Sequence, residues 1–401
     1  MIDAKTADFI GTHRHEDVRK LALSARHVEG IDLTCALQQI AGWQVARAKI
    51  PSWAAIEGVW YPPHLNLEQC SSEATARYKA DLAARLGGAS MVDLTGDMGV
   101  DFSFMARHFS VATYVEQQSQ LCQLAQHNFP LLGIGHASVV NADGCDHLTD
   151  MAPVDLIFLD PARRSKSGGR TYAIVDCQPD VVALAPLLLQ KSSHVMVKLS
   201  PMLDWHAVVK ELPQVAEVHI LSVHGECKEL VVIMSATQPL TTTICCVDDG
   251  QTFRFSAEEQ ASLTITRDIQ VGQLLFEPNA SVMKSGVWGL LSKRYQVAQV
   301  AENSHLFVGT PTFNTSSPDT SEATAFPGRR FVITGLSTLN KRQLKQNLAS
   351  VTRANIATRN FPMTAVELRK RLNLADGGDH YLFGTTTAKG EHLIIICKKI
   401  S

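Results

Sequence analysis

Short apolar runs that each end at an acidic residue constrain the fold of this chain most strongly. Four such runs lie between residues 87 and 160, separated by stretches typical of helices, and their acidic residues are Asp93, Glu116, Asp143 and Asp160. Apolar strands that alternate with helices predict a parallel sheet with crossover helices. Such sheets bind ligands at the carboxyl ends of their strands. We therefore expect the four carboxylates to lie along one edge of one sheet, in the layout of a nucleoside-cofactor site.

The turn after the first of these strands fits a site where the backbone approaches a ligand. Gly96 and Gly99 lack a Cβ and so permit a tight turn and a close approach. Glu116 lies 23 residues after Asp93 and can accept hydrogen bonds from both hydroxyls of a ribose. Asp143 can accept from an adenine amino group, because an ionised carboxylate only accepts.

Spacing alone does not separate a nicotinamide cofactor from S-adenosylmethionine. A dinucleotide site favours Gly-x-Gly-x-x-Gly, whereas this turn reads Gly-Asp-Met-Gly-Val-Asp over residues 96–101. Its two carboxylates would repel a pyrophosphate at the start of a helix, but they tolerate a sulfonium and an ammonium. The alternative is a doubly wound sheet whose acidic residues only cap helices, since Asp is a good N-cap.

Several longer motifs carry a resemblance to a known family. Segment 90–235 resembles a class I S-adenosylmethionine-dependent methyltransferase, and nearly the whole chain resembles a bacterial family of methyltransferase-like proteins with a ferredoxin-like insert and a C-terminal THUMP-like domain. The matching stretches are Leu-Glu-Gln-Cys-Ser-Ser-Glu at 67–73, Asp-Leu-Thr-Gly at 93–96, Asp-Pro-Ala-Arg-Arg at 160–164, Lys-Leu-Ser-Pro-Met at 198–202, Glu-Cys-Lys-Glu-Leu at 226–230, Phe-Glu-Pro-Asn at 276–279, Ala-Asn-Ile at 354–356 and Arg-Asn-Phe-Pro at 359–362. The family usually has glycine where Asp97 stands.

The resemblance implies a fold class and a division into domains. The expected fold is α/β, with a Rossmann-like class I methyltransferase core, a helical N-terminal region, a small α+β ferredoxin-like domain and an α/β THUMP-like C-terminal domain. The expected boundaries are 1–68, 69–238, 239–314 and 328–401. The implied cofactor is S-adenosylmethionine, and its expected contacts are Asp93, Thr95, Gly96, Gly99, Glu116, Asp143, Gly144 and Asp160.

The candidate catalytic residues follow the fourth and fifth predicted strands. Asp160 can accept a proton or a hydrogen bond from a substrate nitrogen, and Arg163 or Arg164 can bind phosphate. Lys198 is either a phosphate ligand or a strand-end lysine with partners of its own. A similar Asp-Pro-Ala-Arg occurs in uracil-C5 methyltransferases, which use a cysteine nucleophile, but no cysteine occurs in residues 198–201. We therefore do not expect a covalent mechanism. The expected reaction is methylation of a base nitrogen.

Composition limits the remaining functional classes. With 401 residues the chain is long enough for several domains. Nine cysteines include no Cys-x-x-Cys pair, so we expect no metal site and reduced thiols. There is no secretion signal pattern at the N-terminus and no apolar run long enough to span a bilayer, so we expect a cytoplasmic protein without a membrane partner.

The C-terminal part is basic. Residues 328–401 hold 13 Lys and Arg against 4 Asp and Glu. Such a segment predicts binding of a polyanion, and with the THUMP-like resemblance we expect RNA, either tRNA or rRNA. The candidate contacts are Arg163, Arg164, Arg359, Arg369, Lys370 and Arg371. The alternatives are a protein that binds RNA without turnover and a methyltransferase acting on a small molecule.

Overall fold

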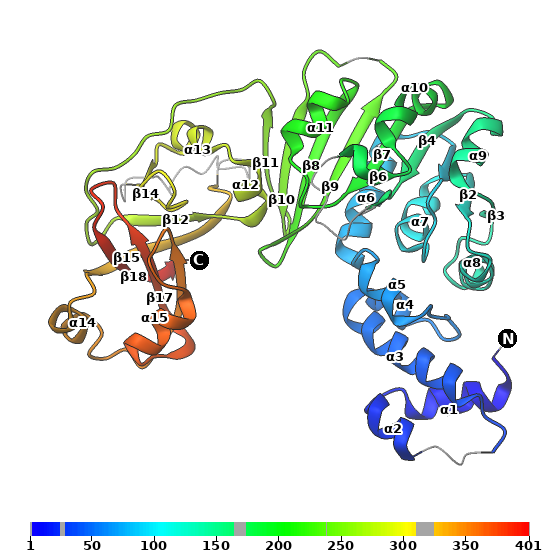
Figure 1. Ribbon diagram of the computed structural model, residues 1–401, viewed down its shortest axis with the longest axis horizontal. Helices are drawn as coiled ribbons and strands as arrows, with labels where there is room; N and C mark the ends of the chain where they lie inside the picture. Colours follow the sequence, from blue (N-terminus) through cyan, green and yellow to red (C-terminus); the bar gives the residue numbers. More distant parts are fainter. Residues whose placement is uncertain (1, 25–28, 164–173, 238, 310–324, 401) are drawn as a thin grey trace, which may run out of the picture. The chain divides into compact units, whose positions relative to one another are not determined.

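The computed structural model describes residues 2–24, 29–163, 174–237, 239–309 and 325–400 (Figure 1). The chain forms two units. The first consists of Met1–Val218 with Lys228–Thr242, and the second of His219–Cys227 with Thr243–Ser401.

The first unit begins with helices, as the sequence predicts. They are α1 (Ala4–His13), α2 (Val18–Ser24), α3 (Leu33–Lys49), α4 (Pro51–Ala54) and α5 (His64–Gln69). Phe9, Leu21 and Ile40 pack into a small core among the first three helices. Asp32 caps α3 by accepting from the Cys35 amide at 3.0 Å, and Pro51 follows the end of that helix. Because Pro lacks an amide hydrogen, it favours a new start there.

The helix that leads into the first strand is capped by a serine. In α6 (Glu73–Leu86), Ser72 accepts from the Thr75 amide and satisfies a free donor of the first turn. Alternating strands and helices follow: β1 (Ser90–Asp93), α7 (Val100–Met105), η1 (Ala106–His108), β2 (Val111–Glu116), α8 (Ser119–Leu131), β3 (Ser138–Asn141), α9 (Gly144–Asp150), β4 (Val154–Leu159), β5 (Ala162–Arg163), η2 (Ile174–Asp176), β6 (Cys177–Gln178), α10 (Val181–Lys191), β7 (Ser192–Leu199), α11 (Trp205–Glu211), β8 (Val215–Val223) and β9 (Glu226–Ser235).

These strands form the expected doubly wound sheet. Seven of them are neighbours in the order β8-β9-β7-β4-β1-β2-β3, whereas β5 and β6 form a separate two-stranded sheet. The second unit begins within β8, at His219. β1 pairs in parallel with β2 and β4, β2 with β3, and β4 with β7, whereas β9 is antiparallel to β7. Residues 156–159 of β4 are all buried, as expected for a central parallel strand covered on both faces. The Rossmann-like core is confirmed, and β4, β1 and β2 place Asp160, Asp93 and Glu116 at one edge.

Further along the second unit, β10 (Thr243–Asp248) and β11 (Gln251–Ser256) form an antiparallel hairpin, and a seven-stranded sheet follows. That sheet has the order β13-β14-β12-β15-β18-β17-β16. Its elements are β12 (Leu274–Pro278), α12 (Ala280–Ser285), α13 (Trp288–Tyr295), β13 (Ala298–Gln299), β14 (Phe307–Gly309), β15 (Gly328–Ser337), α14 (Lys341–Asn347), β16 (Arg353–Arg359), α15 (Ala365–Leu372), β17 (Ala375–Thr386) and β18 (His392–Ile400).

One sheet therefore contains both small domains that the sequence predicts separately. β12 pairs antiparallel with β15, from Leu274 opposite Val332 to Pro278 opposite Gly328. Leu275 and Phe331 share a buried core on one side of this junction. Residues 315–319, between the two expected domains, lie outside the described residues.

Two expectations about the whole chain can be compared with the structure. All nine cysteines are free thiols. Among the described residues, the helices are too short or too polar for any of them to cross a bilayer.

Candidate cofactor site

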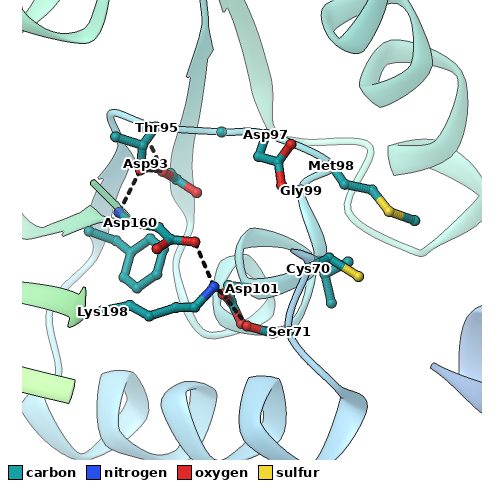
Figure 2. A pocket seen from close by; sticks show the side chains of 13 residues that line it. Cys70, Ser71, Asp93, Thr95, Asp97, Met98, Gly99, Asp101, Asp160 and Lys198 are labelled. Carbon is teal, nitrogen blue, oxygen red and sulfur yellow. Dashed lines mark hydrogen bonds and ion pairs between the residues drawn. The ribbon is translucent and has the colours of Figure 1, made fainter. Parts of the chain in front are cut away.

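A pocket of about 280 Å³ lies at the carboxyl ends of β1 and β4 (Figure 2). Six of the predicted site residues line it: Asp93, Thr95, Gly96, Gly99, Asp160 and Lys198. The remaining lining residues are Cys70, Ser71, Asp97, Met98, Val100, Asp101 and Phe158.

The turn after β1 is held against β2 by a dense set of contacts. A Cβ on Gly96 would lie 2.5 Å from the ring of Tyr114, so only glycine fits there. The Tyr114 hydroxyl donates to the carbonyl of Asp97, and Glu116 Oε2 accepts from the Asp97 amide at 2.9 Å. Glu116 also accepts from the Gln118 amide at 2.7 Å and is buried. Glu116 thus fixes the turn, and it does not line the pocket.

Asp93 is a buried carboxyl with neutral partners. Its Oδ1 accepts from the Thr95 amide at 2.9 Å and from the Thr95 hydroxyl at 3.3 Å. The side chain lines the pocket, yet Asp93 is only 2% exposed. Burial, reinforced by the charges of Asp101 and Asp160, raises the pKa of Asp93 well above its ordinary value against the opposing effect of the Thr95 bonds.

Both the backbone amide and the side chain of Asp160 have partners in the pocket. Its amide donates to Thr95 Oγ1 at 2.6 Å, and its Oδ2 lies 2.5 Å from the ammonium of Lys198. The same ammonium lies 3.6 Å from Asp101 Oδ2. Burial alone would lower the pKa of Lys198, but the Asp160 and Asp101 carboxylates outweigh it and raise that pKa. Lys198 is therefore a cation with partners, which favours the second of its two predicted roles.

A chain of buried ion pairs continues from Asp101 to Lys79 and Glu229. Lys79 is fully buried, and its ammonium contacts Glu229 and lies 3.2 Å from Asp101 Oδ1. Ser71 accepts from Lys79 at 3.2 Å and donates to Asp101 Oδ2 at 2.7 Å. Burial opposes ionisation of Asp101, but Lys79 and Lys198 outweigh it and lower its pKa. The order Glu229–Lys79–Asp101–Lys198–Asp160 alternates in sign.

Sequence reasoning missed most of this chain of charges. Lys79 and Glu229 are 150 residues apart and come from a helix and a strand. The only available signal was the lysine at a position of α6 whose neighbours Ala76, Ala80 and Ala83 form a buried stripe. A lysine in such a stripe needs a buried counter-charge.

The pocket contains one thiol, Cys70, which the sequence analysis did not consider. It donates to the Leu67 carbonyl at 3.2 Å, and burial raises its pKa to about 11. Because the thiolate is the nucleophile, a protonated Cys70 is inert near neutral pH. This agrees with the expectation of a non-covalent mechanism.

Two predicted cofactor residues lie apart from the pocket lining. Asp143 is exposed and caps α9 by accepting from the Cys145 amide at 2.8 Å. At Gly144 a Cβ would lie 2.1 Å from the Leu94 carbonyl oxygen. The capping role and the close approach to Leu94 account for both residues without a ligand, and their contact with adenine stays a prediction.

The arginines after Asp160 are described only in part. Arg163 ends β5, which pairs antiparallel with β6. Arg164 lies outside the described residues.

The basic residues of the second unit differ in their partners. Arg359 lies 3.2 Å from Glu277 Oε1, and Arg369 lies 2.5 Å from Asp376 Oδ1. Glu277 is almost fully buried and also binds Arg329, whose Nε donates at 2.9 Å. Lys370 and Arg371 are exposed on α15, and within the described part of the chain neither forms an ion pair. Of the four candidate contacts in this unit, Lys370 and Arg371 are therefore the two without a carboxylate partner among the described residues.

The donor set of the pocket discriminates between the cofactors considered above. Its side chains offer carboxylates and hydroxyls, and its single ammonium is already paired with two carboxylates. A pyrophosphate would meet this negative lining without a free cation. An adenosine that carries a sulfonium and an ammonium finds acceptors there, so the residues fit S-adenosylmethionine.

Comparison with known proteins supports both small domains. Residues 328–399 match the family model of a THUMP-like domain, and residues 274–313 match that of a ferredoxin-like domain. A solved structure described as that of a "putative methyltransferase" from Porphyromonas gingivalis W83 is 32% identical and covers 100% of both chains, with a TM-score of 0.85.

Other similarities are weaker. An O-methyltransferase from Bacillus cereus solved with S-adenosylhomocysteine is 12% identical, with coverage of 49% of this chain and 98% of that one and a TM-score of 0.33. An rRNA methylase from Streptococcus thermophilus is 15% identical, with coverage of 40% and 96% and a TM-score of 0.31. These two carry no argument about this chain. No curated protein matches it.

Proposed function

We propose that this chain, which belongs to the bacterial family of class I methyltransferase-like proteins with a ferredoxin-like and a THUMP-like domain, is an S-adenosylmethionine-dependent methyltransferase acting on RNA. The observation that carries the proposal is the acidic pocket at the ends of β1 and β4, roofed by a glycine turn that has no room for a side chain at Gly96. Parallel sheets of this type bind their cofactors at such an edge.

The cofactor contacts in this proposal are those predicted from the sequence. Asp93, Thr95, Gly96, Gly99 and Asp160 line the pocket, and Glu116 supports the turn from below. Asp143 and Gly144 belong to the proposal as adenine contacts. When bound, S-adenosylmethionine supplies an electrophilic methyl group, so the protein needs no nucleophile of its own.

Asp160 is the proposed acceptor for the substrate. Its carboxylate is oriented by Lys198 and its backbone by Thr95, so it is prepared to accept a hydrogen bond or a proton from a base nitrogen. The ammonium of Lys198 lies 2.5 Å from Asp160 Oδ2 and so fixes the direction of this carboxyl. Arg163 completes the proposed catalytic group as a ligand for substrate phosphate.

The proposed substrate is a base nitrogen of tRNA or rRNA, bound through the basic C-terminal segment. Lys370 and Arg371 are the first candidates, because Arg359 and Arg369 already bind carboxylates. The nine free thiols are consistent with a cytoplasmic location. The domain boundaries at 69–238, 239–314 and 328–401 are part of the proposal.

Binding measurements test both halves of the proposal. Isothermal titration calorimetry with S-adenosylmethionine and S-adenosylhomocysteine is expected to show one site, and absence of both would refute the enzyme. For RNA, the double variant Lys370→Glu/Arg371→Glu should weaken retention at low salt by at least about tenfold. The matched control is Arg19→Glu/Lys293→Glu, which changes the net charge equally at two exposed positions outside the THUMP-like segment.

The product identifies the substrate. Mass spectrometry of nucleosides from tRNA and rRNA of a deletion strain should show one methylated base missing, restored by the wild-type protein and not by Asp160→Asn. Intact RNA modification together with cofactor binding would favour a small-molecule methyltransferase. RNA binding without cofactor binding would favour an RNA-binding protein without turnover.

A further inference from the structure

The carboxylates of the pocket fall into two groups. Asp101 and Asp160 face the ammonium of Lys198 at 3.6 and 2.5 Å. Among the described residues, Asp93 and Asp97 have no cation within ion-pair distance, although both line the pocket. Their hydrogen bonds come from neutral donors: Thr95 for Asp93, and Asn66 Nδ2 at 3.1 Å for Asp97. The pocket therefore holds two carboxyl groups to which the described residues offer no cation.

Asp97 is placed in this pocket by an unusual backbone. Its φ of 47° lies in the left-handed region, which favours glycine but which Asp and Asn tolerate. The Tyr114 hydroxyl and Glu116 hold its carbonyl and amide, and Asn66 of α5 orients its carboxyl. Figure 2 shows this carboxyl directed into the space bordered by Asp101 and Cys70. The contacts thus keep a charged side chain where a glycine would suffice for the turn.

We propose that Asp97 makes this pocket selective for a positively charged methyl donor over its neutral thioether product. The inference rests on the proposed function, since it concerns the same site. S-adenosylmethionine carries one positive charge more than S-adenosylhomocysteine, and the two are otherwise nearly the same size. In a partly dehydrated pocket, an unpaired carboxylate interacts favourably with that charge and gains little from the thioether. Weaker binding of the product would limit its inhibition of the enzyme.

The surroundings of Asp97 support this role. Burial raises the pKa of Asp97 above its ordinary value, because the ionised carboxylate is poorly solvated in the pocket without a bound cation. The titratable groups that face it are Asp160 and Lys198, which already form an ion pair, and Cys70, which burial keeps protonated. Asp93 adds a second raised pKa nearby. A cationic ligand should therefore release protons when it binds, and a neutral one should not.

Calorimetric titration of both ligands tests the proposal without measuring activity. Asp97→Asn keeps the size, the Asn66 contact and the tolerance of positive φ, but removes the charge. We expect it to weaken binding of S-adenosylmethionine about tenfold and that of S-adenosylhomocysteine by less than about twofold. The control, Asp81→Asn, removes a charge from an exposed position of α6 and should change neither affinity. Equal losses for both ligands, or no loss, would overturn the inference.

The pH dependence gives a second measurement on the wild-type protein. An acid whose pKa is raised protonates at a pH above its ordinary range. Affinity for the cation should therefore decline as the pH falls toward the raised pKa of Asp97, while affinity for the thioether stays flat. Titrations in two buffers of different ionisation enthalpy should show proton release for S-adenosylmethionine alone. Two ligands bound with the same pH dependence refute the role of Asp97 only, whereas failure of the wild type to bind either ligand refutes the proposed function itself.

Discussion

Replacement of Lys79 by methionine should destabilise the first unit severely. Methionine is similar in length and fits an apolar helix stripe, so packing is largely kept while the charge is lost. Lys79 is fully buried between the carboxylates of Glu229 and Asp101, and Ser71 also accepts from it. Removing one partner of a buried ion pair typically costs about 3–5 kcal/mol, because the other charge stays buried without compensation. Here Lys198 still offsets part of the charge of Asp101, so most of the lost stability comes from the uncompensated carboxylate of Glu229.

Urea unfolding followed by tryptophan fluorescence would measure this loss, since Trp43, Trp53, Trp60 and Trp205 lie in the first unit. Adding Glu229→Gln to Lys79→Met should recover about 1–2 kcal/mol, because the orphaned charge is removed. The control Lys210→Met, at an exposed position of α11, should stay within about 0.5 kcal/mol of wild type. A loss below about 1 kcal/mol for Lys79→Met, or no recovery in the double variant, would refute the charge chain.

Three further substitutions test individual parts of the structure. Asp93→Asn should stabilise the first unit by about 1 kcal/mol at pH 8, because the ionised carboxylate is costly to bury. Since the pKa of folded Asp93 is raised, this gain should shrink toward pH 5. A lower free energy of unfolding at pH 8, measured in urea, would contradict this prediction. Gly144→Ala should cost about 1–3 kcal/mol, because its Cβ would lie 2.1 Å from the Leu94 carbonyl oxygen. Gly11→Ala, in α1 with no atom near its Cβ, should cost nothing by the same assay. Glu277→Gln should weaken the β12–β15 junction by about 2 kcal/mol, and unchanged hydrogen-exchange protection of these strands would count against the role of its two arginines.

Local patterns were sufficient for much of the fold. The apolar runs before Asp93, Glu116 and Asp160 are strands, as predicted, and Ser72 is of a residue type that favours the N-cap position it takes in α6. Strand and helix periodicity, caps and turn residues act over a few neighbouring positions, so a single sequence displays them. The clustering of acidic residues at one sheet edge follows from the same patterns, because parallel strands all end on the same side.

Partners between distant segments could not be predicted in this way. Nothing near Lys79 in the sequence indicates Glu229, and Arg359 gives no sign that Glu277 pairs with it. Lys198 left two roles open until its distance to Asp160 was known. These pairs depend on how far each strand is shifted against its neighbours, and on packing that no local signal encodes.

The sequence by itself determined a doubly wound sheet with a carboxylate-lined edge and a basic C-terminal segment, since both rest on residue type and short-range spacing. Only the tertiary structure decided which charges are paired and which stay available. It joined the ferredoxin-like and THUMP-like segments into one sheet through β12 and β15. It also gave Asp101 and Asp160 a cation but, within the described residues, none to Asp93 and Asp97. That outcome depends on side chains brought together from helices and strands far apart in the chain.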